Sequence, residues 1–201
     1  ICGHMSKFFY KDKPIIGLDI SSTGIKLMSV DSKKWLVNGY GSLDLDPLKM
    51  KEALEDDSST FLTDSIKSLM ADKIIGTLTS NRVAIAVPTA RSYTRTFTLP
   101  NSAEKSLDEA VILEAEQYIP IPVSTLYIDY QIIERTKKTI VVLMSAVSKV
   151  IVDNITRSVE AAGLEPIILE PSINSVGRVL TATEDGTLPT IIVDIGPAST
   201  D

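Results

Sequence analysis

Residues 15–30, IIGLDISSTGIKLMSV, constrain the fold more than any other stretch of the chain. Two apolar runs flank a turn of small hydroxyl residues, and this pattern predicts a β-hairpin. A bound phosphate needs close backbone N–H groups, hydroxyl groups and a cation. The turn and the strand after it offer such groups at Ser21, Ser22, Thr23, Gly24 and Lys26. Asp19 is placed to hold a hydrated Mg²⁺ beside the phosphates. The same residues also suit an ordinary hairpin end.

The composition indicates a folded protein that does not bind nucleic acid. The chain has 201 residues, of which 44% are hydrophobic, enough for one large domain or two small ones. Its net charge of −6 argues against nucleic acid, because binding to a phosphate backbone needs a basic face. The sequence has no apolar run as long as a membrane-spanning helix. We therefore expect contact with a membrane only through partners.

The first five residues, ICGHM, look like a cloning scar. They contain Cys2 and His4, the only cysteine and the only histidine in the sequence. The rest of the chain therefore offers no Cys/His metal site and no Cys–His or Ser–His nucleophilic pair. A chain without further cysteines fits a reducing, cytoplasmic setting.

The chain up to residue 88 predicts the order βββαβ. Residues 35–45 form a third strand, so the first three strands make an antiparallel meander. The spacing of apolar residues between positions 62 and 73 predicts one helix, with Ser59 or Thr60 as its cap. Residues 82–88, RVAIAVP, are a short apolar strand of the kind that helices bury.

Residues 89–148 predict a separate small unit with one helix against a sheet. A capping box from Ser106 to Glu109 starts the helix, and Pro120 and Pro122 end it. The strands of this unit are expected at residues 95–99, 126–134 and 140–147.

The remaining sequence returns to larger α/β units. A helical face from Ile151 to Ala162 ends at Gly163, and residues 167–169 predict a short buried strand. Ser172 caps a further helix. Residues 190–195, TIIVDI, predict another buried strand, followed by small residues. The order of residue types is the same as in the opening hairpin: an apolar strand, an aspartate, a glycine and small hydroxyl residues. Here these residues are Asp194, Gly196, Ser199 and Thr200.

Two turns of this kind resemble the two phosphate motifs of the actin-like ATPase superfamily. Residues 109–133 also resemble the inserted subdomain of the PilM family of type IV pilus assembly proteins. That family reads E-A-x-x-x-E-A-x-x-Y-I-P, then P, and then a strand beginning x-D-Y/F. The matching positions in this sequence are Glu109, Ala110, Glu114, Ala115, Tyr118, Ile119, Pro120, Pro122, Asp129 and Tyr130. Residues 160–170, EAAGLEPIILE, and the DIGxxST ending match as well.

The resemblance implies an α/β fold, in which an actin-like (ribonuclease H-like) subdomain carries a small α+β inserted subdomain. The actin-like subdomain would comprise residues 6–88 and 149–189, and the inserted subdomain residues 89–148. Residues 190–201 would begin a second actin-like half.

The resemblance also implies an ATP site with Mg²⁺ in the full-length protein. Asp19 and Asp194 would hold the metal through water. The phosphate-binding residues would be Ser21, Ser22, Thr23, Lys26, Gly196, Ser199 and Thr200. Because this sequence ends before the family's adenosine-binding loop, we expect this chain to bind ATP weakly or not at all. No residue stands out as catalytic, so we expect at most a weak ATPase when full length.

In the resembled family, a groove between the actin-like subdomain and the inserted subdomain receives the N-terminal cytoplasmic peptide of the membrane protein PilN. Tyr118, Tyr127 and Tyr130 are candidates for lining it, although tyrosines beside prolines also pack small cores. The implied setting is cytoplasmic and peripheral to the inner membrane, with other pilus platform and motor proteins as partners. Two alternatives stay open: an FtsA-like filament-forming ATPase of cell division and a sugar-kinase-like phosphotransferase.

Overall fold

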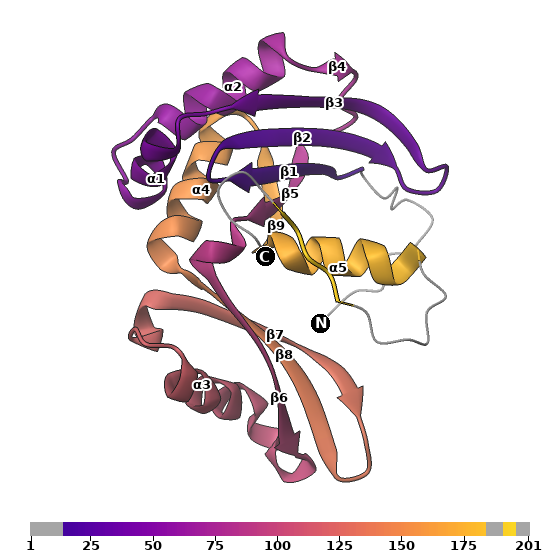
Figure 1. Cartoon of the computed structure of the whole chain (residues 1–201), viewed down its shortest axis with the longest axis vertical. Helices are drawn as coiled ribbons and strands as arrows, with labels where there is room; N and C mark the ends of the chain where they lie inside the picture. Colours follow the sequence, from indigo (N-terminus) through magenta and orange to yellow (C-terminus); the bar gives the residue numbers. More distant parts are fainter. Residues whose placement is uncertain (1–13, 184–190, 196–201) are drawn as a thin grey trace, which may run out of the picture.

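Two β-sheets organise the chain (Figure 1). The computed structural model describes residues 14–183 and 191–195. The larger sheet has the strand order β4-β3-β2-β1-β5-β9, and the smaller sheet has the order β6-β8-β7. The strands of the larger sheet are β1 (Ile16–Ser21), β2 (Gly24–Asp31), β3 (Leu36–Asp44), β4 (Ile75–Gly76), β5 (Arg82–Val87) and β9 (Glu165–Pro171). Those of the smaller sheet are β6 (Ser92–Pro100), β7 (Leu126–Arg135) and β8 (Thr139–Ser148).

The larger sheet starts with the predicted hairpin. Strands β1 and β2 pair antiparallel, β3 continues the meander, and β5 and β9 extend it in parallel from β1. Alternate side chains of β1 point to one face, where Ile16, Leu18 and Ile20 are buried. The predicted hairpin, third strand and apolar strand β5 are therefore confirmed.

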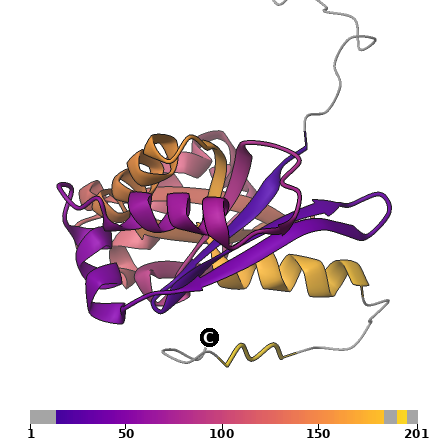
Figure 2. The same cartoon turned by 90° about the horizontal axis from the view of Figure 1, so that it is seen from above.

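Three helices cover the face of the larger sheet on which its core lies, and a fourth lies on the opposite face (Figure 2). The covering helices are α1 (Pro47–Glu55), α2 (Phe61–Asp72) and α4 (Lys149–Ala161), and α5 (Ser172–Thr183) lies opposite. In α4 the predicted apolar face packs into the core through Ile151, Ile155 and Val159. Gly163 ends this region with a φ of 90°, a left-handed conformation that glycine adopts without strain.

The helical part between β3 and β5 differs from the prediction, because two helices lie there and only the second was expected. Asp46 caps α1 by accepting hydrogen bonds from the N–H groups of Leu48 and Lys49. Asp56 then ends α1, and its carboxylate accepts from the N–H of Ser58. The periodicity of α1 is hard to see in the sequence because its short apolar face, buried at Met50, Ala53 and Leu54, lies among charged residues.

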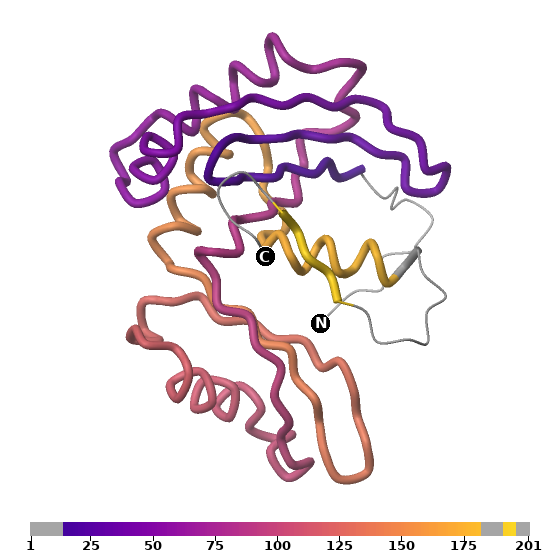
Figure 3. The backbone as a smooth tube through the Cα atoms, in the orientation of Figure 1, coloured from indigo at the N-terminus to yellow at the C-terminus, as the bar shows by residue number. Residues whose placement is uncertain are grey.

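The smaller sheet forms the predicted unit between β5 and α4 (Figure 3). Helix α3 (Leu107–Tyr118) packs on it through Val111 and Ala115 and gives it a core of its own. Three short 3₁₀ helices join the elements: η2 (Thr89–Arg91), η3 (Asn101–Ser106) and η4 (Val123–Thr125). The prediction of a capping box at the start of α3 was wrong. The 3₁₀ helix η3 runs directly into α3, and the side chain of Ser106 makes no capping hydrogen bond.

Two segments near the end of the chain were predicted to be buried strands, and that prediction of burial was wrong for both. Strand β9 lies at the edge of its sheet, and Ile168 is 50% exposed. Residues 191–195 contain only an isolated bridge at Ile195, and Ile191 is 90% exposed. Apolar runs predict burial, and Leu169 of β9 does pack against the core, but Ile167 and Ile168 at the sheet edge and the side chains of Ile191, Val193 and Ile195 stay exposed. The cloning-scar residues 1–5 and the predicted small-residue ending, Gly196, Ser199 and Thr200, lie outside the described residues.

A buried amide joins α4 to the end of α1. The Nδ2 atom of Asn154 donates to the carbonyl oxygen of Leu54 over 3.1 Å, and Asn154 is almost fully buried. The last carbonyls of a helix lack partners within it, so Asn154→Ala leaves a buried acceptor unpaired. We expect this substitution to lower the free energy of unfolding by about 1–3 kcal/mol in urea denaturation.

The matched control lies one turn further along α4. Arg157 donates to the carbonyl oxygen of Asp57, but this contact is exposed to solvent. We expect Arg157→Ala to change the free energy of unfolding by no more than about 0.5 kcal/mol. Equal losses for the two variants would show that burial does not determine the strength of this helix connection.

Candidate phosphate pocket and apolar groove

The β1–β2 turn forms one wall of a pocket of about 560 Å³, which we call the β1–β2 pocket. The other walls come from the ends of β3 and β5, the first turn of α5 and residues 194–195. The structure therefore brings together all described residues that were predicted to bind phosphate or metal. They are Asp19, Ser21, Ser22, Thr23, Lys26 and Asp194.

Hydrogen bonds within the turn hold its backbone in place. The hydroxyl of Ser21 donates to the carbonyl oxygen of Gly24 over 3.0 Å and accepts from the N–H of Thr23 over 3.3 Å. The carbonyl oxygen of Thr23 accepts from the N–H of Leu45 over 2.8 Å, which ties the turn to the end of β3. A turn fixed in this way is preorganised for an anion.

Two carboxylates and one ammonium group line the pocket. Asp19 and Lys26 are opposed in the β1–β2 register, with 3.8 Å between Nζ and Oδ2. Burial raises the pKa of Asp19, the Lys26 ammonium lowers it, and the Asp194 carboxylate raises it. Asp194 therefore lies close enough to Asp19 for the two charges to repel, and a cation between them would relieve that repulsion.

The donor set of this pocket fits Mg²⁺ better than a metal bound by protein ligands alone. Among the described residues, no three His, Cys, Asp or Glu side chains cluster closely enough to hold a metal ion. Mg²⁺ commonly uses one or two carboxylates and takes its other ligands from water and phosphate oxygens. Asp19 and Asp194 would be those two carboxylates.

Sequence reasoning missed the contribution of α5 to the pocket. Ser172 and Ser175, in the first turn of α5, line the pocket opposite the hairpin turn. Backbone N–H groups at a helix start favour anions. Ser172 was predicted only as a helix cap. The signal that could have placed it at the pocket is its position at the carboxyl end of a parallel strand, where ligand-binding loops gather in α/β sheets.

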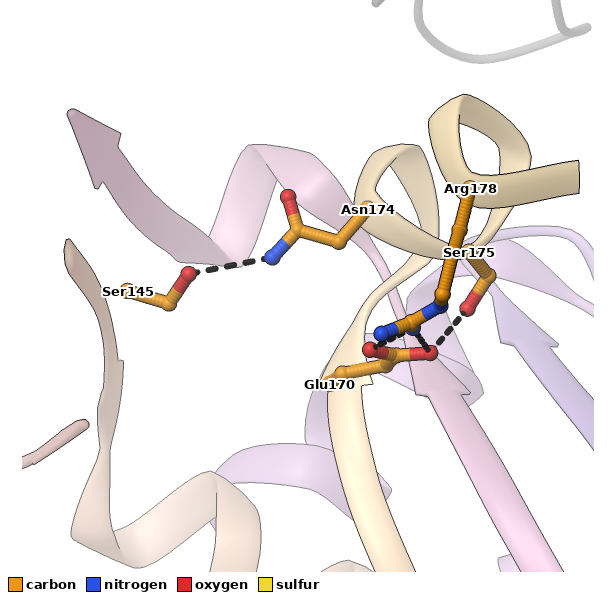
Figure 4. Close-up of polar contacts among 5 residues, drawn as sticks. All are labelled: Ser145, Glu170, Asn174, Ser175 and Arg178. Atoms are coloured by element: carbon orange, nitrogen blue, oxygen red, sulfur yellow. Dashed lines mark hydrogen bonds and ion pairs between the residues drawn. The ribbon is translucent and has the colours of Figure 1, made fainter. Parts of the chain in front are cut away.

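Polar contacts tie the first turn of α5 to its surroundings (Figure 4). Asn174 donates to the hydroxyl of Ser145 on β8 over 3.0 Å, so α5 also contacts the smaller sheet. Ser175 donates to Glu170 over 2.6 Å, and Arg178 pairs with the same carboxylate. These bonds fix Ser175 at the pocket wall.

A second depression of about 540 Å³ lies between α3 and β7, and we call it the α3–β7 groove. Its walls are mostly apolar, and Lys149 at the start of α4 closes one end. Strand β7 lies at the edge of its sheet, because only β8 pairs with it among the described strands. The residues lining the groove are Asp108, Val111, Ile112, Val123, Ser124, Leu126, Tyr127, Ile128, Asp129, Tyr130 and Lys149.

Two of the three predicted tyrosines line this groove, and hydrogen bonds fix both rings. The Tyr127 hydroxyl donates to Asp153 over 3.0 Å, and the Tyr130 hydroxyl donates to Asp108 over 2.6 Å. Each bond raises the pKa of its tyrosine, because it favours the protonated form. Tyr118 does not line the groove, and its ring stacks against the Arg95 guanidinium at 3.3 Å.

The raised pKa of Asp19 leads to a test by pH. A carboxyl group whose pKa is raised in the folded state contributes stability that is complete below its ordinary pKa, which is 3.8 for Asp19. That stability is lost as pH rises through the raised pKa. We therefore expect Asp19→Asn to raise the melting temperature at about pH 7 and to give no gain at about pH 3. Calorimetric melting at both pH values measures this, and a gain of equal size at both would show that ionisation of Asp19 is not the cause.

No helix in the described part of the chain is both long enough and apolar enough to cross a membrane. The meander, the parallel crossover to β5, the inserted sheet and the pocket at the first hairpin define an actin-like fold. A family model described as type IV pilus assembly protein PilM matches residues 17–197. The chain belongs to the PilM family of type IV pilus assembly proteins.

Solved structures support the same fold. The chain is similar to the structure titled PilM-PilN type IV pilus biogenesis complex, with a TM-score of 0.72 and 22% identity over 84% of this chain. It spans 50% of the length of that relative. The cytoplasmic domain of EpsL, an inner-membrane component of the Vibrio cholerae type II secretion system, is similar over 78% of this chain and 56% of its own, with a TM-score of 0.52 and 11% identity. At these identities the likeness shows the fold.

Proposed function

We propose that this chain is an adaptor of type IV pilus assembly that binds the N-terminal cytoplasmic peptide of a PilN-type membrane protein. The observation that carries the proposal is the α3–β7 groove, an apolar depression beside an exposed strand edge. The groove lies mostly within the smaller unit and reaches α4, which covers the larger sheet, only at Lys149, whereas the resemblance implies a groove between the two subdomains. The proposed setting is the cytoplasmic face of the inner membrane, where such a peptide would be presented.

The chemistry of the groove suits a short extended peptide. Strand β7 is an edge strand, which among the described strands pairs only with β8, although the N–H of Tyr130 donates to the Asp129 carboxylate over 2.8 Å. Apolar side chains such as Ile112 and Val123 offer pockets for alternate peptide side chains. The rings of Tyr127 and Tyr130 are already held by Asp153 and Asp108, so ordering them on binding costs little entropy. A volume of about 540 Å³ is typical of a ligand site and small for a folded partner.

For the β1–β2 pocket we propose the phosphate side of an ATP site. Turn amides, the hydroxyls of Ser22 and Thr23 and the ammonium of Lys26 would hold phosphate oxygens, while the Ser21 hydroxyl holds the turn itself. Bound Mg²⁺ would neutralise phosphate charge, and Asp19 and Asp194 would hold it through water. Because the chain spans half of its PilM relative, nucleotide binding by the whole protein is part of this proposal, and we expect weak binding by this chain. We further propose that residues 6–88 with 149–189, and 89–148, are the two subdomains.

Isothermal calorimetry with a synthetic PilN N-terminal peptide tests the adaptor function. We expect saturable heat with one site per chain, and NMR shift changes at the lining residues of the α3–β7 groove. No heat and no shift change at millimolar peptide would overturn the proposal. ATP-dependent sedimentation would instead favour an FtsA-like filament protein, and ATP consumption with a small acceptor would favour a phosphotransferase.

A further inference from the structure

The loop between β2 and β3 gathers basic and apolar side chains at one exposed point. The hairpin projects beyond the rest of the molecule (Figure 2). Lys33 and Lys34 are exposed there, and Trp35 and Leu36 beside them are 72% and 55% exposed. Single exposed apolar side chains are common, but contiguous ones mark contact sites, and Val37 next to Leu36 is also 47% exposed.

Hydrogen bonds to the Asp31 side chain stabilise the backbone of this loop. The Asp31 carboxylate accepts from the N–H of Lys33 over 3.0 Å and from the N–H of Lys34 over 3.2 Å. Trp35 has a φ of 52°, a left-handed conformation that bulky residues rarely adopt and that glycine or asparagine would suit better. The fold thus keeps a tryptophan at a position that favours a small residue, and its ring stays in solvent.

The charges of the loop oppose those of the chain as a whole. Lys34 lies 3.9 Å from the Asp31 carboxylate, so the two lysines and this aspartate leave a net positive charge at the tip. The whole chain carries −6. Salt screens charges separated by more than about 8 Å, so the distant acidic residues weaken attraction at the tip only in part.

We propose that this hairpin tip, residues 32–37, contacts the surface of an anionic lipid bilayer. Tryptophan prefers the boundary between headgroups and acyl chains, and lysines beside it pair with anionic headgroups while their stems lie along apolar surface. The small size of the tip favours a bilayer over a protein, because a specific protein interface takes about 20–30 residues on each partner and the tip is residues 32–37. The contact goes beyond peptide binding in the α3–β7 groove and does not depend on it. It also differs from the expectation, drawn from the sequence, that the chain meets a membrane only through partners.

Tryptophan fluorescence of the whole chain tests this contact, because Trp35 is its only tryptophan. We expect vesicles of mixed phosphatidylglycerol and phosphatidylcholine to shift the Trp35 emission to shorter wavelength, and pure phosphatidylcholine vesicles to leave it unchanged. High salt should reverse the shift. Each lysine near an anionic surface contributes about fivefold to binding, so K33E/K34E should lower vesicle affinity by more than about 25-fold.

Matched variants separate the tip from general charge effects. The double variant Lys51→Glu and Lys67→Glu changes the net charge by the same amount as K33E/K34E, but at exposed positions of α1 and α2. It should keep the vesicle-induced shift of the Trp35 emission. In vesicle sedimentation, Trp35→Asn should lose binding while folding normally, because asparagine suits the left-handed backbone.

Four results would overturn the proposal: no emission shift, an equal shift with uncharged vesicles, equal loss in the Lys51/Lys67 control, or normal vesicle binding by Trp35→Asn. A shift that grows with protein concentration without lipid would instead assign the tip to a second copy of the chain.

Discussion

Replacing Ile112 with glutamate is expected to weaken binding of the PilN-type peptide by at least about tenfold. Ile112 lies on α3, lines the α3–β7 groove and is 45% exposed. A carboxylate there would have to lose water when an apolar peptide side chain covers it, and that desolvation opposes binding. The half-exposed position means that the unbound fold tolerates the charge. Isothermal calorimetry with the same peptide measures the loss.

The next residue of α3 provides the control. Leu113 is 60% exposed and does not line the groove. Leu113→Glu makes the same chemical change and places the new carboxylate four residues after Glu109, as Ile112→Glu does after Asp108. The cost to the helix is similar in kind, although Ile112→Glu lies three or four residues from Asp108, Glu109 and Glu116, and Leu113→Glu only from Glu109 and Glu116. Peptide affinity that falls equally in both variants would place the peptide elsewhere, or show that helix stability rather than the groove controls binding.

The hairpin and the inserted unit could be predicted because their signals are local. Apolar alternation and a small-residue turn determine β1 and β2, and the prolines at positions 120 and 122 end α3 by backbone geometry. The candidate metal and phosphate residues Asp19 and Lys26 were found for the same reason, because their pairing follows directly from the hairpin register.

The rest depends on contacts between distant segments, which one sequence does not display. Ser175 joins the β1–β2 pocket only because β9 lies beside β5 and turns α5 toward the hairpin. The exposure of β9 also follows from its place at the sheet edge, whereas its apolar sequence alone predicts burial. Likewise, Tyr127 and Tyr130 are three positions apart on β7, so strand alternation alone would point them to opposite faces. They line one groove because Asp153 of α4 holds the first ring and Asp108 of α3 holds the second, while Tyr118 lies against Arg95.

Replacing Gly24 with alanine is expected to disrupt the β1–β2 pocket and to lower the free energy of unfolding by about 1–3 kcal/mol. A Cβ atom on Gly24 would lie 2.6 Å from the carbonyl oxygen of Leu43 and 3.3 Å from the Cα atom of Asp44. Both are backbone atoms of β3, so relief requires β2 and β3 to separate beside the turn. The carbonyl oxygen of Gly24, which accepts from Ser21, would move with them.

The same substitution at Gly177 should have the opposite effect on stability. A Cβ atom there meets nothing within 4 Å, and Gly177 lies inside α5, where alanine is favoured over glycine by about 0.5–1 kcal/mol. Urea denaturation should therefore separate the two variants in sign, and phosphate-induced NMR shifts at the β1–β2 turn should survive only in Gly177→Ala. If Gly24→Ala left both the free energy of unfolding and the phosphate-induced NMR shifts unchanged, the backbone of β3 could move away from the new Cβ atom at little cost. Close packing of β3 against Gly24 would then not determine the conformation of the turn.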